Sequence, residues 1–290
     1  MSKLNSSSLF HFTSSKNVLF KILRTGIRFS YCYESFGKGK GMAIPMICFC
    51  DIPLMRSLDH RSKYGDYAIG FNKEYLMSHS GGQLNPIQYV TSPLNLLGRD
   101  LYSDLIIDQL DEGFKNIMDI IFKEYSVEKI EEEGVQIVDE ELRYRSESFS
   151  IAKMFYRNQK AFSRHYQERI KNKIIINYDE REWRLVPYLN EADEEYPKWI
   201  ENVTEDEFSQ SKESFTKAIS NASKSHIVIP SSDINNAITA IVVKNERMVR
   251  ETIKMIMKSN MLFGSKINIR EDKLLLISKL TSFERIEDDY

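Results

Sequence analysis

Two glutamates near the middle of the chain, separated by one residue, are the side chains best suited to catalysis. Glu180 and Glu182 lie in the segment 178–187, and Arg184 follows at the same spacing. The apolar residues 174–176 come directly before this segment and predict a β-strand, in which residues i and i+2 share one face. Two carboxylates and a guanidinium on one face can stabilise a cationic centre and orient a ribose hydroxyl. Transfer of ADP-ribose from NAD is one reaction that would require such a group.

A second pair of candidate residues lies near the N-terminus. His11 and Thr13 belong to the alternating run 9–13, which predicts a short strand with both side chains on one face. A helix over residues 17–23 follows, and Gly26 supplies the left-handed residue that ends it. This order of strand, helix, glycine and new strand resembles the opening unit of ADP-ribosyltransferase-like folds. In those folds a strand-borne histidine followed by a small hydroxyl residue holds the adenosine-side ribose of NAD. The alternative is a buried histidine that bonds only to the backbone.

Several segments of the chain resemble a known family, and they are residues 8–13, 43–53, 64–71 and 180–184. They are similar to the AbiGi family from bacterial abortive-infection loci, whose members are often labelled antitoxins. The order of the parts also resembles ADP-ribosyltransferases that modify nucleic acid, such as the DarT family. The first resemblance implies a role in phage defence and a cognate toxin or antitoxin as partner. The second implies NAD as co-substrate.

The second resemblance also suggests a role for each charged residue of the central segment. Loss of nicotinamide from NAD develops positive charge on the ribose, as glycoside hydrolysis does. Glu182 would stabilise that charge through the 2′-hydroxyl, and Glu180 would steer or deprotonate the acceptor. Arg184 would bind pyrophosphate or hold Glu182 in place. The structural alternative is that both acids simply pair with neighbouring arginines.

Three further residues are candidates for contact with NAD. Tyr64 and Tyr67 flank Gly65 and would stack on the nicotinamide ring, although aromatic residues beside a strand also pack in cores. Asp51 follows a predicted strand and would bind ribose, unless it only begins the turn before Pro53.

A basic segment with interleaved aromatic residues predicts the acceptor. Cations for phosphates and rings for bases are the features of a single-strand nucleic-acid groove. RNA or single-stranded DNA is therefore the first expected acceptor and protein the second; the alternative is an amphipathic helix with its aromatic residues in the core. The nucleic-acid-binding candidates are Lys153, Arg157, Lys160, Arg164, Arg169 and Lys171.

The sequence predicts an α+β fold, with an ADP-ribosyltransferase-like split, mixed or antiparallel β-sheet core and a helical insertion. One domain is expected over residues 1–290, and the insertion over 98–172, where apolar residues recur at helical spacing. A last strand is expected at 273–279. Hydrophobic content of 42% and charged content of 28% are those of a soluble globular protein.

Composition and missing motifs narrow the function. The net charge of −2 gives no general affinity for nucleic acid, and no P-loop or Gly-x-Gly-x-x-Gly motif is present. The sequence contains neither a signal peptide nor an apolar run long enough for a membrane span, so we expect a cytoplasmic protein without a membrane partner. Three cysteines predict no disulfide framework and no metal site.

Two other function classes stay open. A non-catalytic binding module with an antitoxin role would keep the fold and neutralise a partner. A nuclease would use Glu180, Glu182 and Asp179 to hold Mg²⁺, but in a strand Asp179 points away from the two glutamates.

Overall fold

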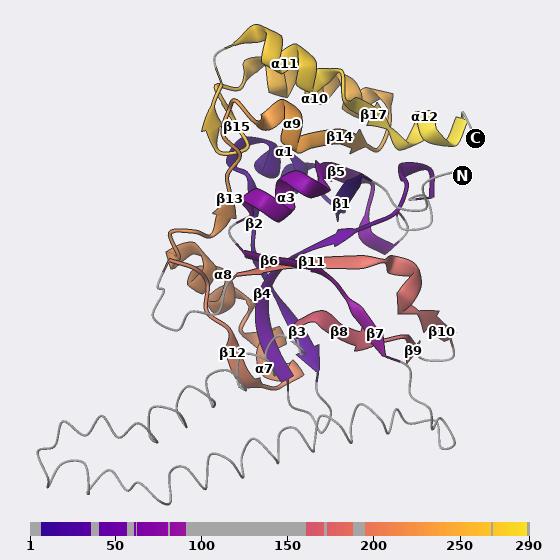
Figure 1. The fold of residues 1–290 in the computed structure, drawn as a ribbon, viewed down its shortest axis with the longest axis vertical. Helices are drawn as coiled ribbons and strands as arrows, with labels where there is room; N and C mark the ends of the chain where they lie inside the picture. The colour runs from indigo at the N-terminus through magenta and orange to yellow at the C-terminus, as the bar shows by residue number, and fades with distance from the viewer. Residues whose placement is uncertain are drawn as a thin grey trace, which may run out of the picture.

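One mixed β-sheet forms the centre of the computed structural model (Figure 1). Its strands follow the order β17-β14-β5-β1-β4-β11-β6, and β3 and β12 also pair with β4. β14 and β17 run parallel, whereas the other neighbours are antiparallel. The strands of this sheet are β1 Ser8–Thr13, β3 Ser30–Ser35, β4 Gly41–Cys50, β5 Tyr67–Asn72, β6 Gly82–Pro86, β11 Glu182–Pro187, β12 Ile200–Val203, β14 Ile238–Val243 and β17 Leu280–Ser282.

Helices gather at two ends of the sheet. Figure 1 shows α9, α10 and α11 beside β14, and α7 and α8 beside β3 and β12. The helices are α1 Lys16–Thr25, α3 Lys73–His79, α7 Glu205–Gln210, α8 Lys212–Asn221, α9 Ile234–Ala237, α10 Glu246–Lys258, α11 Arg270–Ile277 and α12 Phe283–Asp288, with 3-10 turns η1 Leu54–Arg56 and η2 Asn177–Glu180.

Short strand pairs complete the fold. They are β2 Ile27–Arg28 with β13 His226–Ile227, β7 Gln88–Val90 with β8 Ser163–His165, β9 Gln167–Ile170 with β10 Lys173–Ile176, and β15 Met261–Leu262 with β16 Ser265–Lys266. The structure describes residues 7–35, 41–56, 61, 63–80, 82–90, 161–170, 173–187, 195–267 and 269–288. None of the helices within these ranges is both long and apolar enough to cross a bilayer.

The sheet splits between β1 and β4. These two strands share one registered pair, Phe10 with Cys50, whereas β1 pairs with β5 along its whole length. Beyond that pair the two strands diverge, and the ring of His11 bonds to the carbonyl oxygen of Cys48 across the gap. This joint separates a half built on β5, β14 and β17 from a half built on β4, β11 and β6.

The two faces of the sheet bury different residues. Residues that pair across strands share a face, so Phe10, Cys50 and Glu182 lie on one side, which we call the β8 face. Neighbouring residues such as Phe49 and Leu185 point to the other side, where they join the largest hydrophobic cluster together with residues of α1. We call this side the α1 face.

Local sequence explains the first helix. Leu19, Ile22 and Leu23 of α1 recur at helical spacing and are buried on the α1 face. Gly26 ends the helix with a φ of 87°, a conformation that glycine adopts without steric cost. A Cβ at Gly26 would lie 2.2 Å from the carbonyl oxygen of Ile227, so the position also requires the close approach of two backbones. The strand at 9–13, the helix and the glycine were all predicted correctly.

Two predicted elements are wrong. Residues 273–279 were expected to form a strand, but most of them belong to helix α11. A short apolar run does not distinguish the two states, and the acids Glu271 and Asp272 in the first turn favour a helix start. At the end of the expected helical insertion, residues 163–170 form β8 and β9 instead, and most of the remaining insertion lies outside the described residues.

Candidate functional site

Charged side chains from separate segments meet on the β8 face. We call them the carboxylate–arginine cluster: Glu34 of β3, Arg164 of β8, Glu180 at the end of η2, and Glu182 and Arg184 of β11. Arg164 Nη1 lies 3.0 Å from Glu180 Oε2 and 3.3 Å from Glu182 Oε2, so one guanidinium bridges the two predicted catalytic acids. The cluster therefore contains both glutamates and the arginine predicted from the sequence.

The backbone brings Glu180 and Glu182 together in an unexpected way. The prediction placed both on one strand, but Glu180 ends a 3-10 turn and β11 begins only at Glu182. Arg181 between them takes the left-handed conformation with a φ of 42°. The shared-face argument therefore fails for Glu180, and the bridging Arg164 links the two carboxylates instead.

Arg184 anchors the buried side of the cluster. Only 3% of its side chain is exposed, yet it donates from Nε to Glu182 at 2.9 Å and from Nη1 to the carbonyl oxygen of Ala161 at 2.8 Å. Its Nη2 lies 2.7 Å from Glu34 Oε1. Burial disfavours the charged guanidinium, but the two carboxylates outweigh it and raise the pKa of Arg184 above its usual value. The arginine thus ties β3 to β11.

Glu180 occupies the more accessible side. Its carboxylate receives hydrogen bonds from Lys63, Tyr64 and Arg164. Burial opposes its ionisation, but the bonds from Lys63 and Tyr64 outweigh burial and hold the pKa of Glu180 below its ordinary value. Glu180 itself is 5% exposed, whereas the Lys63 side chain is 43% exposed. An ionised carboxylate therefore lies directly beneath a cation that solvent reaches.

Tyrosines line this side of the cluster. Burial, followed by the hydrogen bond to Glu180, raises the pKa of Tyr64. The backbone N–H of Glu182 donates to the hydroxyl of Tyr89 at 3.0 Å, and burial raises the pKa of Tyr89 to about 12. Both phenols are therefore neutral near pH 7 and act as hydrogen-bonding groups.

The cluster balances acidic against basic side chains in a largely buried place. Three acids, Glu34, Glu180 and Glu182, face three cations, Lys63, Arg164 and Arg184. Such a group either stabilises the fold as a network of ion pairs or exchanges a cation for a positively charged reacting group. Glu180 pairs with Lys63, which solvent reaches, so this carboxylate can exchange its cation more easily than Glu34 or Glu182, which pair with the buried Arg184.

His11 and Thr13 lie on the α1 face and do not join the cluster. His11 and Thr13 lie one and three residues after Phe10 in β1. Because side chains alternate along a strand, both point away from the side that Phe10 shares with Glu182. The His11 ring bonds to the Cys48 carbonyl oxygen at 2.9 Å, and burial lowers its pKa. Thr13 Oγ1 accepts the N–H of Ser15 at 3.4 Å. The structure shows the backbone bond that the alternative interpretation of His11 expected.

The other residues predicted to contact NAD lie in three different places. Tyr64 joins the cluster, whereas Tyr67 is buried in the hydrophobic cluster of the α1 face. Asp51 is buried and bonds to Lys73 at 2.5 Å, and the Lys73 ammonium lies 4.7 Å from the ring centre of Trp183. Within the described part of the chain, the second carboxylate oxygen of Asp51 has no hydrogen-bond partner.

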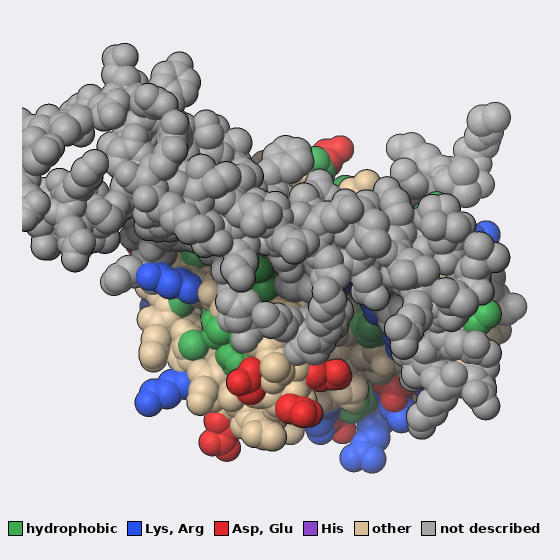
Figure 2. All heavy atoms as spheres, turned by 90° about the horizontal axis from the view of Figure 1, so that it is seen from below, with side chains coloured by type: hydrophobic (Ala, Val, Ile, Leu, Met, Phe, Trp, Pro, Cys, Tyr) green, Lys and Arg blue, Asp and Glu red, His purple; other side chains and the backbone are tan. Residues whose placement is uncertain are grey.

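The predicted nucleic-acid segment is described only in part. Lys153, Arg157, Lys160 and Lys171 lie outside the described residues, and Arg169 belongs to strand β9. Arg164 bonds to the cluster glutamates. Seen from below the view of Figure 1, the described surface shows acidic and basic side chains intermingled (Figure 2).

Sequence analysis missed three members of this site. Glu34 alternates with Tyr31 and Tyr33 in β3, a signal that could have marked it as facing away from those rings. Lys63 and Tyr89 carry no local signal, because their roles depend on pairing between distant segments. Among the described residues, no group of three His, Cys, Asp or Glu side chains is placed to hold a metal, and Asp179 is exposed while Glu180 and Glu182 are buried.

Known proteins resemble the chain over most of its length. Residues 27–226 match the family model described as "Putative abortive phage resistance protein AbiGi, antitoxin". The protein named abortive phage resistance protein AbiGi from Lactococcus lactis subsp. cremoris is 25% identical over 267 residues, which cover 85% of this chain and 89% of that protein. No solved structure matches the chain.

Proposed function

We propose, because this chain belongs to the AbiGi family of abortive phage resistance proteins, that it acts in phage defence as an NAD-dependent ADP-ribosyltransferase. One observation carries the proposal: Glu180 and Glu182, both buried, converge on the single guanidinium of Arg164 beside Tyr64. Two carboxylates fixed at one point can stabilise an oxocarbenium-like ribose and receive a proton from the acceptor.

The split sheet supports the ADP-ribosyltransferase-like fold as part of this proposal. β1, which carries His11, and β11, which carries Glu182, are both neighbours of β4. The two predicted halves of the site thus lie on adjoining strands, even though their side chains point to opposite faces. The residues of the β8 face fit the reacting ribose of NAD, whereas His11 and Thr13 do not reach that face.

The chain's residues would divide the work. The bond between the ribose C1′ and nicotinamide breaks, nicotinamide leaves, and a new bond forms between C1′ and the acceptor atom. Glu182, fixed by Arg184 at 2.9 Å, would bond the ribose 2′-hydroxyl and stabilise the cationic carbon. Glu180 would take the acceptor's proton once Lys63 moves aside, since that ion pair is the one solvent reaches. We propose a nucleic acid, either RNA or single-stranded DNA, as the acceptor ahead of protein.

Labelled NAD tests this function directly. The purified chain is incubated with NAD that carries a label in its adenylate phosphate. Separate reactions also contain total RNA, single-stranded DNA or a cell lysate as the acceptor. We expect transfer of label to one of them, and a rate about 10²–10³-fold lower for Glu182→Gln, because an electrostatic contact to the reacting centre is lost. The matched control is Glu213→Gln, an exposed glutamate of α8. Full activity of Glu182→Gln, or no transfer to any acceptor, would contradict the proposal.

A second candidate function is a non-catalytic antitoxin, a binding module that neutralises a partner toxin. Two observations favour it: the matching family model carries the word antitoxin, and each cluster carboxylate is already paired with a cation. Expression of the chain alone separates the two. A toxin slows growth, and Glu182→Gln relieves it; an antitoxin leaves growth unchanged with or without the substitution.

A further inference from the structure

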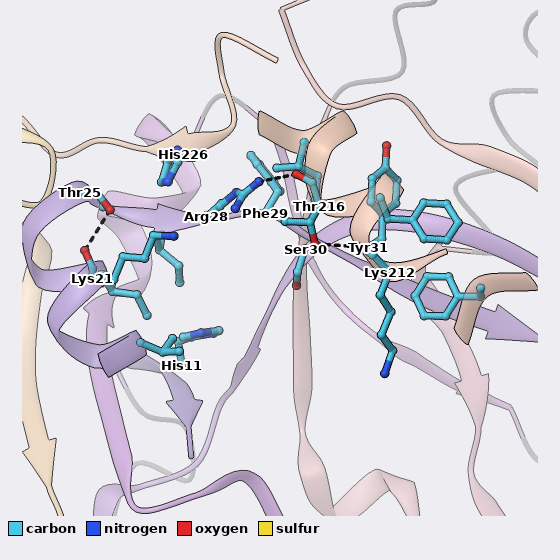
Figure 3. A pocket seen from close by; sticks show the side chains of 17 residues that line it. His11, Lys21, Thr25, Arg28, Phe29, Ser30, Tyr31, Lys212, Thr216 and His226 are labelled. Carbon is cyan, nitrogen blue, oxygen red and sulfur yellow. Dashed lines mark hydrogen bonds between the residues drawn. The ribbon is translucent and has the colours of Figure 1, made fainter. Parts of the chain in front are cut away.

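A cavity of about 460 Å³ opens on the α1 face (Figure 3). Its walls come from β1, α1, β2, β3, α7, α8 and β13. His11 contributes to it, whereas the members of the carboxylate–arginine cluster do not. The volume lies within the range of about 300–1,000 Å³ that small-molecule sites occupy.

The charges of the cavity are all of one sign. Lys21, Arg28 and Lys212 line it together with His11 and His226, and none of its described lining residues is an aspartate or glutamate. Among the described residues, none of the three cations forms an ion pair. A concave site with uncompensated positive charge favours an anion.

One end of the cavity concentrates this charge. Figure 3 shows the Lys21 side chain extending toward the region of His226 and Arg28. Burial, and then the positive charges of Arg28 and Lys21, lower the pKa of His226, which indicates that the three groups lie close together. Arg28 Nη2 donates to the Thr216 carbonyl oxygen at 2.7 Å, which fixes the guanidinium, while its buried Nε has no hydrogen-bond partner among the described residues.

Aromatic rings form the other end. The rings of Phe208 and Phe215 have centroids 5.1 Å apart, and Tyr31 lies 5.3 Å from Phe215. All three residues line the cavity. A flat base or another ring can pack against such a wall, and each stacked base contributes about 1–3 kcal/mol in single-strand nucleic-acid sites.

We propose that this cavity binds a phosphorylated nucleoside, with its phosphate between Lys21, Arg28 and His226 and its base against Phe208 and Phe215. The phosphate supplies the anionic partner that these cations lack among the described residues, and the base supplies a ring for the aromatic wall. A free mononucleotide and the 5′-phosphorylated end of a nucleic acid share this chemistry. The site lies on the other face from the proposed catalytic cluster, so the inference goes beyond the proposed function and does not depend on it.

Titration calorimetry on the full chain tests the site with five probes: AMP, adenosine, inorganic phosphate, a dinucleotide with a 5′-phosphate and the same dinucleotide without it. We expect AMP to bind at least about tenfold more tightly than adenosine or phosphate alone, because only AMP uses both ends of the cavity. Tighter binding of the 5′-phosphorylated dinucleotide than of AMP would identify a nucleic-acid end as the source. Equal or weaker binding would identify a free nucleotide. Either result supports the site.

Matched variants locate the binding. Lys21→Gln removes one phosphate-facing cation from the exposed side of α1, and we expect it to weaken AMP binding about tenfold. Lys217→Gln, on the exposed surface of α8 outside the cavity lining, is the control and should bind like the parent. Phe215→Leu should weaken AMP but leave phosphate unchanged. Melting temperatures confirm that each variant is folded.

The inference is overturned if AMP does not bind, if phosphate binds as tightly as AMP, or if Lys21→Gln binds like the control. Binding is measured without any reaction and is repeated in Glu182→Gln. Failure of the cavity site is therefore distinguishable from failure of the proposed transferase activity.

Discussion

The two faces of the sheet treat charge in opposite ways. On the β8 face, each carboxylate of the cluster lies within 3.3 Å of an arginine nitrogen, and Arg184 pairs with two of them at once. On the α1 face, the cavity gathers cations that have no acidic partner among the described residues. A compensated network can stabilise the fold by itself, whereas uncompensated charge costs free energy until something binds. The comparison suggests that the charges of the β8 face stabilise the fold and that those of the α1 face bind a ligand.

The strongest test of this contrast is loss of Arg184. Arg184→Ala removes the cation that the half-buried Glu34 and the buried Glu182 share, and we expect a loss of about 3–5 kcal/mol in the free energy of unfolding. Denaturant unfolding followed by circular dichroism measures it. The control is Arg247→Ala on α10, whose side chain is 85% exposed and pairs only with Glu251 among the described residues. A loss for Arg184→Ala no larger than for this control would show that the cluster does not stabilise the fold.

The cavity cations should behave in the reverse way. Lys212→Gln removes a charge that has no ion-pair partner in the described part of the chain, so we expect the free energy of unfolding to change by no more than about 0.5 kcal/mol. The same denaturant experiment, without added nucleotide, measures this change. A loss comparable to that of Arg184→Ala would mean that Lys212 belongs to the framework of the fold, and the contrast between the faces would not hold.

The pH dependence of stability should also divide between the faces. Burial lowers the pKa of His11 and of His226, so the unfolded chain binds protons more readily and stability falls as pH drops below about 6.5. Hydrogen bonds from Lys63 and Tyr64 hold the pKa of Glu180 low against its burial, so the stability that it contributes is lost only below about 4.3.

Unfolding free energies measured between pH 8 and pH 3 separate these contributions. His226→Gln should reduce the fall in stability between pH 7 and pH 5, and Glu180→Gln should reduce the fall below pH 4.3, each leaving the other range unchanged. If His226→Gln shows the same fall as the parent between pH 7 and pH 5, the cavity histidine does not titrate as the structure indicates.

Local pattern was enough to predict the elements that carry the site, but not how they meet. Alternation correctly placed His11 and Thr13 on one face of a strand, and periodicity predicted α1. Which face Glu182 shares depends on the register of β11 and β1 against β4, where a shift of one residue reverses every side chain. Sequence alone does not fix that register, so residues predicted to share a site lie on opposite faces.

The members of the carboxylate–arginine cluster also meet through strand pairing that the sequence alone does not reveal. Glu34 reaches the cluster only because β3 and β11 both pair with β4, and Arg164 because β8 lies beside β7. Sequence analysis placed Arg164 among the cations of a predicted single-strand nucleic-acid groove, since its neighbours are cationic and aromatic. Long-range pairing, which a single sequence does not reveal, turned it toward Glu180 and Glu182 instead.

The cavity lies beside the joint between β1 and β4, which we call the seam of the sheet. At this seam one registered backbone pair, Phe10 with Cys50, and the bond from His11 to the Cys48 carbonyl oxygen link the two strands, and the hydrophobic cluster of the α1 face packs across it. The cavity straddles the seam, because its walls include β1 and α1 on one side and β3, α7 and α8 on the other. The cluster lies wholly on one side of it. A ligand that fills the cavity would therefore contact elements of both halves of the sheet at once.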